Sequence, residues 1–181
     1  APSLHGRAEG HPMKGYRLVS PEAYTGNPFT VIGKEWLIVA AGTPQRHNGM
    51  TASWGNMGVF WGKPAVTVYI RPTRYTKEFV DGSDLFTLSV FSEDYRPALN
   101  LFGTKSGRDC DKDGEAHLTP LAVDGTVAYA EAKTVFVCRK LAHADLDPAR
   151  FDDPSADGKW YPKKDYHTAY IAEILAIYEK E

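Results

Sequence analysis

The sequence has little of what marks membrane proteins, disulfide scaffolds or nucleic-acid binders. Its longest mostly apolar runs, such as residues 36–42, fall far short of the roughly 20 residues that a membrane-spanning helix needs. Cys110 and Cys138 are the two cysteines, and they form neither a CxxC pair nor a metal-ligand spacing. The formal net charge of −2, from 21 basic and 23 acidic residues, shows no excess of one sign. The sequence therefore excludes a transmembrane protein and a disulfide miniprotein, and it predicts no nucleic-acid or membrane partner.

What remains is a chain with the composition of an ordinary globular protein. Its 181 residues are 43% hydrophobic and 24% charged, which is enough for one domain with a core of its own. Two cysteines in a chain of this size are typical of a reducing compartment, so we expect a cytoplasmic location. Residues 1–12 lack the pattern of a secretory signal. We predict an N-terminal extension over residues 1–15 and a single domain over residues 16–181.

Short apolar and β-branched runs dominate the chain. Residues 35–42 form a nearly continuous apolar run, which is typical of a strand buried on both faces. Asp124-Gly125 between apolar residues predicts a β-hairpin. Further strands are predicted at residues 65–71, 85–91 and 134–139. Many strands at short spacing predict a β-rich α+β fold, closer to a barrel than to a doubly wound sheet.

Helices are expected to be few and short. One is predicted at residues 73–79, with Thr73 as its cap, and another at residues 95–102, preceded by a capping Ser92. Residues 144–164 are rich in Asp, Pro and Lys, and they predict a long excursion over the surface.

The C-terminal segment, residues 168–181, fits two structures. A helical period is matched by Tyr170, Ile171, Ile174, Leu175 and Tyr178, whereas a buried strand is matched by Ala169, Ile171, Leu175 and Ile177. Periodicity alone favours the helix.

Three polar clusters interrupt the apolar strands, and the first covers residues 48–57. It contains the hydroxyls of Thr51 and Ser53 and the flat face of Trp54, beside glycines that let a ligand approach the backbone. A strand with alternate residues facing solvent explains the same composition.

The other two clusters carry positive charge. Residues 71–76 place Arg71 and Arg74 at a strand-to-helix turn, where arginine forks and backbone N–H groups suit a phosphate. Residues 103–109 combine small residues with Lys105 and Arg108, a composition that suits an anion-binding turn. Solvent-exposed turns explain both clusters equally well.

Common catalytic signatures are missing. No strand is followed by Gly-x-Gly-x-x-Gly, no serine lies in Gly-x-Ser-x-Gly, and the six histidines show no HExxH spacing. We therefore predict no Rossmann nucleotide site, no serine nucleophile and no metal site.

With these clusters in order, the chain resembles the flavin reductase-like family, most closely its flavoredoxin-type branch. The resemblance covers about residues 16–178 and rests on residues 48–54, 63–64, 71–76, 79, 100–109 and 167–174. It implies an FMN-binding split β-barrel with a few short peripheral helices, usually a homodimer with flavin near the subunit interface. It also implies that the C-terminal segment is a strand, and we adopt that prediction.

The resemblance further implies how the clusters divide the cofactor. One stretch lies against the isoalloxazine ring: Thr51, Ala52, Ser53 and Trp54. Other residues form the phosphate region: Arg71, Thr73, Arg74, Tyr75, Thr76, Lys105, Ser106, Gly107 and Arg108. His167 lies near the reactive face of the flavin, as the candidate catalytic residue that orients the donor. Ala172 stands where family members often have glycine, so its methyl group is expected to affect how nicotinamide docks.

Three functions follow from this resemblance. The first is an FMN-dependent oxidoreductase that takes hydride from NADH or NADPH and passes electrons to an acceptor. The second is a flavoredoxin-like electron carrier that exchanges electrons with a redox partner protein and has no efficient NAD(P)H reaction of its own. The third is a relative that binds another ligand, or none, in the same cleft. The sequence does not distinguish NADH from NADPH and does not name the acceptor.

Overall fold

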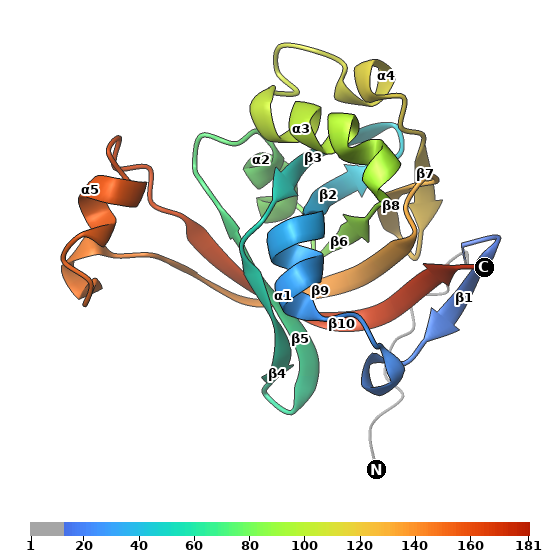
Figure 1. The fold of residues 1–181 in the computed structure, drawn as a ribbon, viewed down its shortest axis with the longest axis horizontal. Helices are drawn as coiled ribbons and strands as arrows, with labels where there is room; N and C mark the ends of the chain where they lie inside the picture. Colours follow the sequence, from blue (N-terminus) through green and yellow to red (C-terminus); the bar gives the residue numbers. More distant parts are fainter. Residues whose placement is uncertain (1–12) are drawn as a thin grey trace.

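Strand β2 (Leu37–Thr43) lies in a strongly curved sheet in the computed structural model, which describes residues 13–181 (Figure 1). Leu37, Val39 and Ala41 face one apolar core, whereas Ile38 and Ala40 face a second. Neighbouring side chains on a strand point to opposite faces. The continuous apolar run therefore reflects two covered faces, and the predicted strand is confirmed.

The main sheet has eight antiparallel strands in the order β3-β2-β6-β9-β10-β5-β4, with β1 paired to β10. Its other strands are β1 (Tyr16–Val19), β3 (Arg46–Ala52), β4 (Gly55–Phe60), β5 (Lys63–Ile70), β6 (Leu85–Val90), β9 (Thr134–Asp145) and β10 (Thr168–Lys180). Strands β3 and β4 end this order, and within residues 13–181 they do not pair with each other. The result is an open, β-rich sheet that agrees with the predicted split barrel.

The expected Asp-Gly hairpin forms a small separate sheet. Strands β7 (Pro120–Val123) and β8 (Thr126–Tyr129) are joined by Asp124 and Gly125, with φ of 46° and 87°. Positive φ at both central residues is what a two-residue hairpin turn requires. The β-hairpin predicted at Asp124-Gly125 is therefore confirmed.

Short helices lie outside the sheet, as predicted. They are α1 (Pro28–Thr30), α2 (Thr76–Asp81), α3 (Arg96–Thr104), α4 (Lys112–Ala116) and α5 (Ala156–Trp160). A π-helical turn (Val31–Glu35) continues α1, and 3₁₀ turns occupy Pro21–Ala23, Glu93–Tyr95 and Pro148–Arg150. Helix α3 packs on β3, and α2 packs on both β2 and β3.

Two predicted helix starts need correction. Helix α2 begins at Thr76 rather than Thr73, because residues 73–75 still belong to the turn after β5. Before α3, Ser92 makes no side-chain capping bond, and a 3₁₀ turn precedes the helix.

The C-terminal segment is a strand, as the resemblance implied and against its own periodicity. Strand β10 pairs with β5 and β9, and its register with β9 shifts between Ile171 and Ala172 and again between Ile174 and Ala176. Such bulges break the alternation of a strand. They explain why the apolar positions also fit a helical period.

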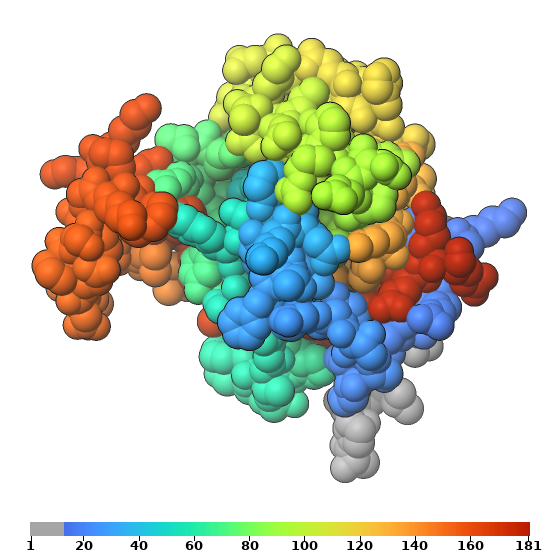
Figure 2. Space-filling model, in the orientation of Figure 1, coloured from blue at the N-terminus to red at the C-terminus, as the bar shows by residue number. Residues whose placement is uncertain are grey.

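The excursion predicted at residues 144–164 is shifted in the structure: residues 144 and 145 still belong to β9, and the chain leaves the sheet over residues 146–167, which carry α5. In Figures 1 and 2 this segment stands away from the body of the protein, in orange. At its base the Leu146 N–H donates to the His167 carbonyl over 3.0 Å. We call it the α5 excursion.

Residues 1–12 of the expected N-terminal extension lie outside the described residues, so the proposed boundary between extension and domain stays a prediction. No helix within residues 13–181 is long and apolar enough to cross a membrane.

Candidate functional site

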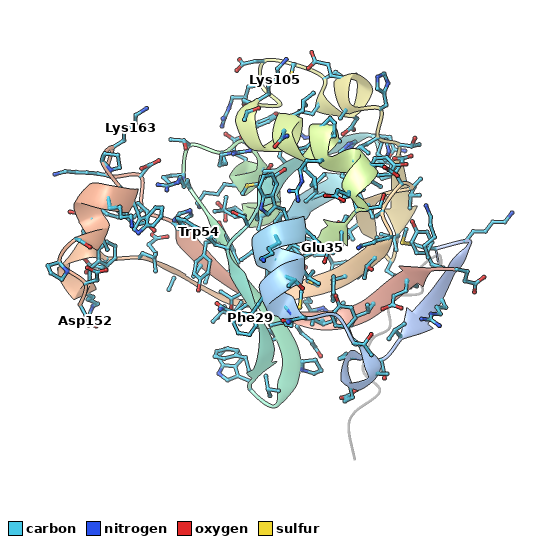
Figure 3. All side chains as sticks on the ribbon, viewed as in Figure 1. Phe29, Glu35, Trp54, Lys105, Asp152 and Lys163 are labelled. Carbon is cyan, nitrogen blue, oxygen red and sulfur yellow. The ribbon has the colours of Figure 1, made fainter. Side chains whose placement is uncertain are left out.

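The candidate site lies where the sheet is open. Only Ser53 and Trp54 separate the edge strands β3 and β4 in the chain, and both residues line two adjoining cavities of about 640 and 200 Å³. Tyr69 and His167 also line both cavities. Figure 3 shows Trp54 on the side of the body that faces the α5 excursion, with Phe29 nearer the β4–β5 hairpin. We call these spaces the larger and the smaller cavity.

The larger cavity is apolar and partly aromatic. Besides the four shared residues, its lining comprises Pro28, Phe29, Ile32, Gly33, Gly55, Asn56, Met57, Leu146 and Tyr161. Asn27 caps α1 by accepting the Phe29 N–H over 3.0 Å, and this cap holds Phe29 at the cavity. A volume of this size and an apolar lining suit a flat organic ligand.

The smaller cavity carries the cations. Arg71 and Arg74 line it together with Met50, Thr51 and Ala52, so seven of the predicted site residues meet there: Thr51, Ala52, Ser53, Trp54, Arg71, Arg74 and His167. Strand β3 supplies Thr51 and Ala52, and the turn after β5 supplies both arginines. Thr51 is positioned by its hydroxyl, which donates to the Leu99 carbonyl of α3 over 2.5 Å.

Arg74 and Lys112 meet at the C-terminal end of α3. The guanidinium of Arg74 donates to the carbonyls of Phe102 (2.8 Å) and Gly103 (3.1 Å). The buried ammonium of Lys112 donates to the carbonyls of Gly49 (2.8 Å) and Phe102 (3.4 Å). Cations suit the exposed carbonyls at a helix C-terminus. Burial and the charge of Arg74 lower the pKa of Lys112 to about 8.

No carboxylate within residues 13–181 forms a salt bridge with Arg74 or Lys112. An arginine also has more N–H groups than these carbonyl bonds use. The region around the smaller cavity therefore holds positive charge that a bound anion can compensate.

Arg71, unlike Arg74, forms a salt bridge with a carboxylate. Its guanidinium bonds the Asp165 carboxylate (3.1 Å) and the Trp160 carbonyl (3.0 Å), and it lies over the Tyr161 ring at 4.9 Å. Arg71 therefore anchors the α5 excursion to the end of β5, and its charge is already paired.

His167 lies at the junction of the two cavities and is 7% exposed. Its Nδ1 is 2.7 Å from the Tyr161 hydroxyl, and its ring centroid lies 5.4 Å from that of Trp54. Burial, together with the charge of Arg71, lowers the pKa of His167 to about 4. The imidazole is therefore neutral at physiological pH, and burial raises the pKa of Tyr161, so the phenol keeps its proton. Where the phenol donates to Nδ1, the imidazole proton lies on Nε2.

The remaining predicted residues lie apart from the two cavities. Tyr75 and Gly107 line a third cavity of about 280 Å³ with Lys112, and Thr76 donates to the buried Asn48 amide over 2.7 Å. Thr73 is exposed. Three others are held in local contacts: Lys105 pairs with Glu115, Arg108 pairs with Glu78, and Ser106 accepts the Arg108 N–H.

Sequence reasoning missed Tyr161, Asp165 and Lys112. The first two belong to a segment whose composition indicated only surface, and no local signal links them to His167. Lys112 follows directly after the third polar cluster, in Cys110-Asp111-Lys112, and extending that cluster by three residues would have found it.

Ala172 takes no part in the site. Its side chain is fully buried in the apolar core and lines neither cavity, so the expected effect of its methyl group on nicotinamide docking is not supported. Both cysteines are free thiols, and in residues 13–181 no three metal-ligating side chains cluster.

One comparison with known proteins identifies a family. Residues 32–181 match the model of the Flavin reductase like domain. No curated protein sequence matches the chain.

Several solved structures share its fold at low sequence identity. An FMN-binding domain of a flavin reductases-like enzyme from Shewanella baltica OS155 superposes with a TM-score of 0.66 at 18% identity, covering 94% of this chain and 80% of that chain. Flavoredoxin of Desulfovibrio vulgaris (Miyazaki F) gives 0.61 at 22% identity, covering 81% and 69%. The NADH:FAD oxidoreductase SgcE6 of Streptomyces globisporus C-1027 gives 0.60 at 16% identity, covering 80% and 75%.

Proposed function

The chain belongs to the flavin reductase-like domain family, and we propose that it is an FMN-binding oxidoreductase that takes hydride from NADH or NADPH and passes the electrons to an acceptor. The observation that carries this proposal is the joining of an apolar cavity to a cationic one through Ser53, Trp54, Tyr69 and His167. FMN has the same division, because a flat ring is joined to a phosphate. The solved neighbours support the proposal, since one is described as FMN-binding and another as an NADH:FAD oxidoreductase.

The residues of the site fit FMN by their chemistry. Arg74 has charge without a carboxylate partner and unused N–H groups for a phosphate, while Trp54 and the backbone of residues 51–54 form a wall for the ring. When bound, FMN supplies the acceptance of hydride and the onward transfer of electrons. The chain contributes binding and orientation, and His167 offers the Nε2 proton as a hydrogen-bond donor beside Trp54.

The test is the visible spectrum of the purified protein with FMN, before and after anaerobic addition of NADH or NADPH. We expect flavin absorption that either nucleotide bleaches. An Arg74→Gln variant should bind FMN about tenfold or more weakly, since a charge-assisted contact contributes roughly 1.5–3 kcal/mol. Arg150→Gln, on the exposed face of the α5 excursion, is the matched control. Failure to bind FMN would overturn the proposal, whereas binding without bleaching by either nucleotide would identify a flavoredoxin-like carrier.

We also propose that the protein is a homodimer. Three large side chains are exposed on and near the β4–β5 hairpin: Phe29 (87%), Val59 (79%) and Trp61 (65%). Such groups on an edge strand favour association. Light scattering coupled to size exclusion should give twice the 20.0 kDa chain mass, and a Val59→Lys, Trp61→Lys variant should elute as the monomer.

A further inference from the structure

The two cavities hold no spare cation for the phosphates of a nucleotide donor. In the proposed function the ring of FMN lies in the larger cavity, none of whose described lining residues is Lys or Arg, and its phosphate binds Arg74. Arg71 is already paired with Asp165. A dinucleotide that brings its nicotinamide to the flavin also carries a pyrophosphate, which needs cations of its own. Those cations must lie outside the cavities, beside their openings.

The end of the α5 excursion supplies unpaired cations next to the larger cavity. Residues 158–165 contain one carboxylate, Asp165, which Arg71 neutralises, and three exposed lysines: Lys159, Lys163 and Lys164. No salt bridge in the described part of the chain includes any of these lysines. The segment is held at the site, because Tyr161 lines the larger cavity and its carbonyl accepts the Lys164 N–H over 3.0 Å.

An exposed aromatic ring accompanies these lysines. Trp160 is 44% exposed, although it meets Trp54 edge to face at a centroid distance of 5.1 Å, and the Lys159 ammonium lies 4.8 Å from its ring centroid. An exposed indole beside an ammonium group suits a base that is joined to a phosphate. Because Trp54 lines both cavities, this surface adjoins the place where the nicotinamide must reach the flavin.

The other carboxylates of the excursion are held in local contacts or lie at its other end. Asp157 accepts the Tyr166 hydroxyl over 2.7 Å, and Figure 3 shows Asp152 and Lys163 at opposite ends of the excursion. Two more accept N–H groups of their own turns: Asp147 and Asp153. A free carboxylate at the adenosine ribose favours NADH, whereas a cation there favours the 2′-phosphate of NADPH. The unpaired charge near Trp160 is positive.

Building on the proposed function, we propose that the α5 excursion binds the adenosine and phosphate half of the nucleotide donor and selects NADPH over NADH. The exposed Trp160 ring contacts the adenine. The ammonium groups of Lys159, Lys163 and Lys164 bind the pyrophosphate and the 2′-phosphate. Because Arg71 holds the Trp160 carbonyl over 3.0 Å, this surface stays beside the cavities while FMN occupies them.

The test is calorimetric titration of NADP⁺ and NAD⁺ into the oxidised, FMN-loaded protein, which measures binding without turnover. We expect NADP⁺ to bind at least about tenfold more tightly, since only NADP⁺ carries the 2′-phosphate. The double variant Lys159→Gln, Lys163→Gln should weaken NADP⁺ binding about tenfold and leave FMN binding unchanged. The matched control is Lys14→Gln, Lys34→Gln, which removes the same charge from exposed lysines outside the excursion, one of them next to the cavity residue Gly33.

A truncated donor locates the effect. Reduced nicotinamide mononucleotide lacks the adenosine half, so the excursion variant should oxidise it with the wild-type kcat/KM while it loses about tenfold with NADPH. Bleaching of the flavin by NADPH is recorded on the same samples. If NADPH bleaches the flavin but the excursion variant binds NADP⁺ as the wild type does, or if NAD⁺ binds as tightly as NADP⁺, the inference is overturned and the proposed function stands. A protein whose flavin no nucleotide reduces refutes the proposed function, and this inference with it.

Discussion

The Tyr161 hydroxyl lies 2.7 Å from Nδ1 of His167, so the residue that follows helix α5 contacts the residue that directly precedes strand β10. With the phenol as donor and Nδ1 as acceptor, the His167 proton lies on Nε2, at the junction of the two cavities. The excursion thereby contributes to the site although most of it stands away from the sheet (Figure 1).

Tyr161→Phe removes this hydrogen bond and keeps the ring. A phenol that donates to Nδ1 stabilises neutral imidazole, so on this assignment its loss should raise the pKa of His167 from about 4, and the acid limb of NADH oxidation should move to higher pH. The pH dependence of kcat/KM from about pH 4.5 to about pH 8 measures this. Tyr166→Phe, which breaks a bond to Asp157 in the same excursion, is the control and should keep the wild-type profile. An unchanged profile in Tyr161→Phe would show that the phenol does not control His167.

His167 should make the fold sensitive to acid. Its pKa is about 4 in the folded state and 6.5 in the ordinary case, so between these values the unfolded chain takes up a proton that the folded protein does not. The free energy of unfolding should fall with decreasing pH across this window, by on the order of 3 kcal/mol at 1.36 kcal/mol per pKa unit. Urea denaturation at several pH values measures the slope. His167→Gln should flatten it, and His143→Gln, at an exposed histidine, should not.

His47 should affect the pH dependence of stability in the opposite direction: its contribution to the free energy of unfolding should decrease as the pH rises. Its Nε2 bonds the Asp113 carboxylate and its Nδ1 donates to the Thr43 carbonyl over 2.9 Å, and the Asp113 bond is the largest cause that raises the pKa of His47. The imidazolium therefore stabilises the fold fully below pH 6.5, and this contribution is lost as the pH rises through the folded-state pKa. His47→Gln should lower stability at pH 6 more than at alkaline pH, as thermal unfolding would show. If His47→Gln lowered stability equally at pH 6 and at alkaline pH, an ion pair between His47 and Asp113 would be ruled out.

Arg71→Gln should loosen the α5 excursion. The guanidinium holds Asp165, the Trp160 carbonyl and the Tyr161 ring, whereas glutamine replaces none of these contacts fully. Tryptic cleavage after Lys159, Lys163 or Lys164 should become faster by about tenfold, as expected if local opening becomes easier by about 1.4 kcal/mol. Lys77→Gln, which breaks a surface pair with Asp81, is the control. Identical cleavage rates would mean that other contacts hold the excursion.

Gly107→Ala should destabilise the turn after α3. A Cβ at Gly107 would lie 1.9 Å from the side-chain nitrogen of Asn48, whose amide is buried and accepts the Thr76 hydroxyl. Moving Asn48 leaves a buried polar group without its partner, at a cost of about 1–3 kcal/mol in unfolding free energy. Gly58→Ala on β4, where a Cβ meets nothing within 4 Å, should cost less in the same urea titration.

The sequence by itself determined the features that arise between residues adjacent in the chain, namely the buried strand β2 and the β7–β8 hairpin. The apolar run of β2 required two covered faces, and Asp124-Gly125 supplied both positive φ values of its hairpin. The composition of residues 51–54 also fitted a strand with alternate residues facing solvent, and only the resemblance assigned them to a ligand wall. The resemblance also predicted β10 correctly, whereas its bulges made the periodicity misleading.

Only the tertiary structure decided which polar groups face one another. Arg71 and Asp165 are 94 residues apart in the chain, and Lys112 and Gly49 are 63 apart, yet each pair is in contact. Such contacts also explain why the charge of Arg71 is paired with a carboxylate and that of Arg74 is not. Asp165 neutralises Arg71, whereas Arg74 meets only carbonyls at the end of α3. Composition reveals the charges, but chain folding determines which of them are paired and which are left for a ligand.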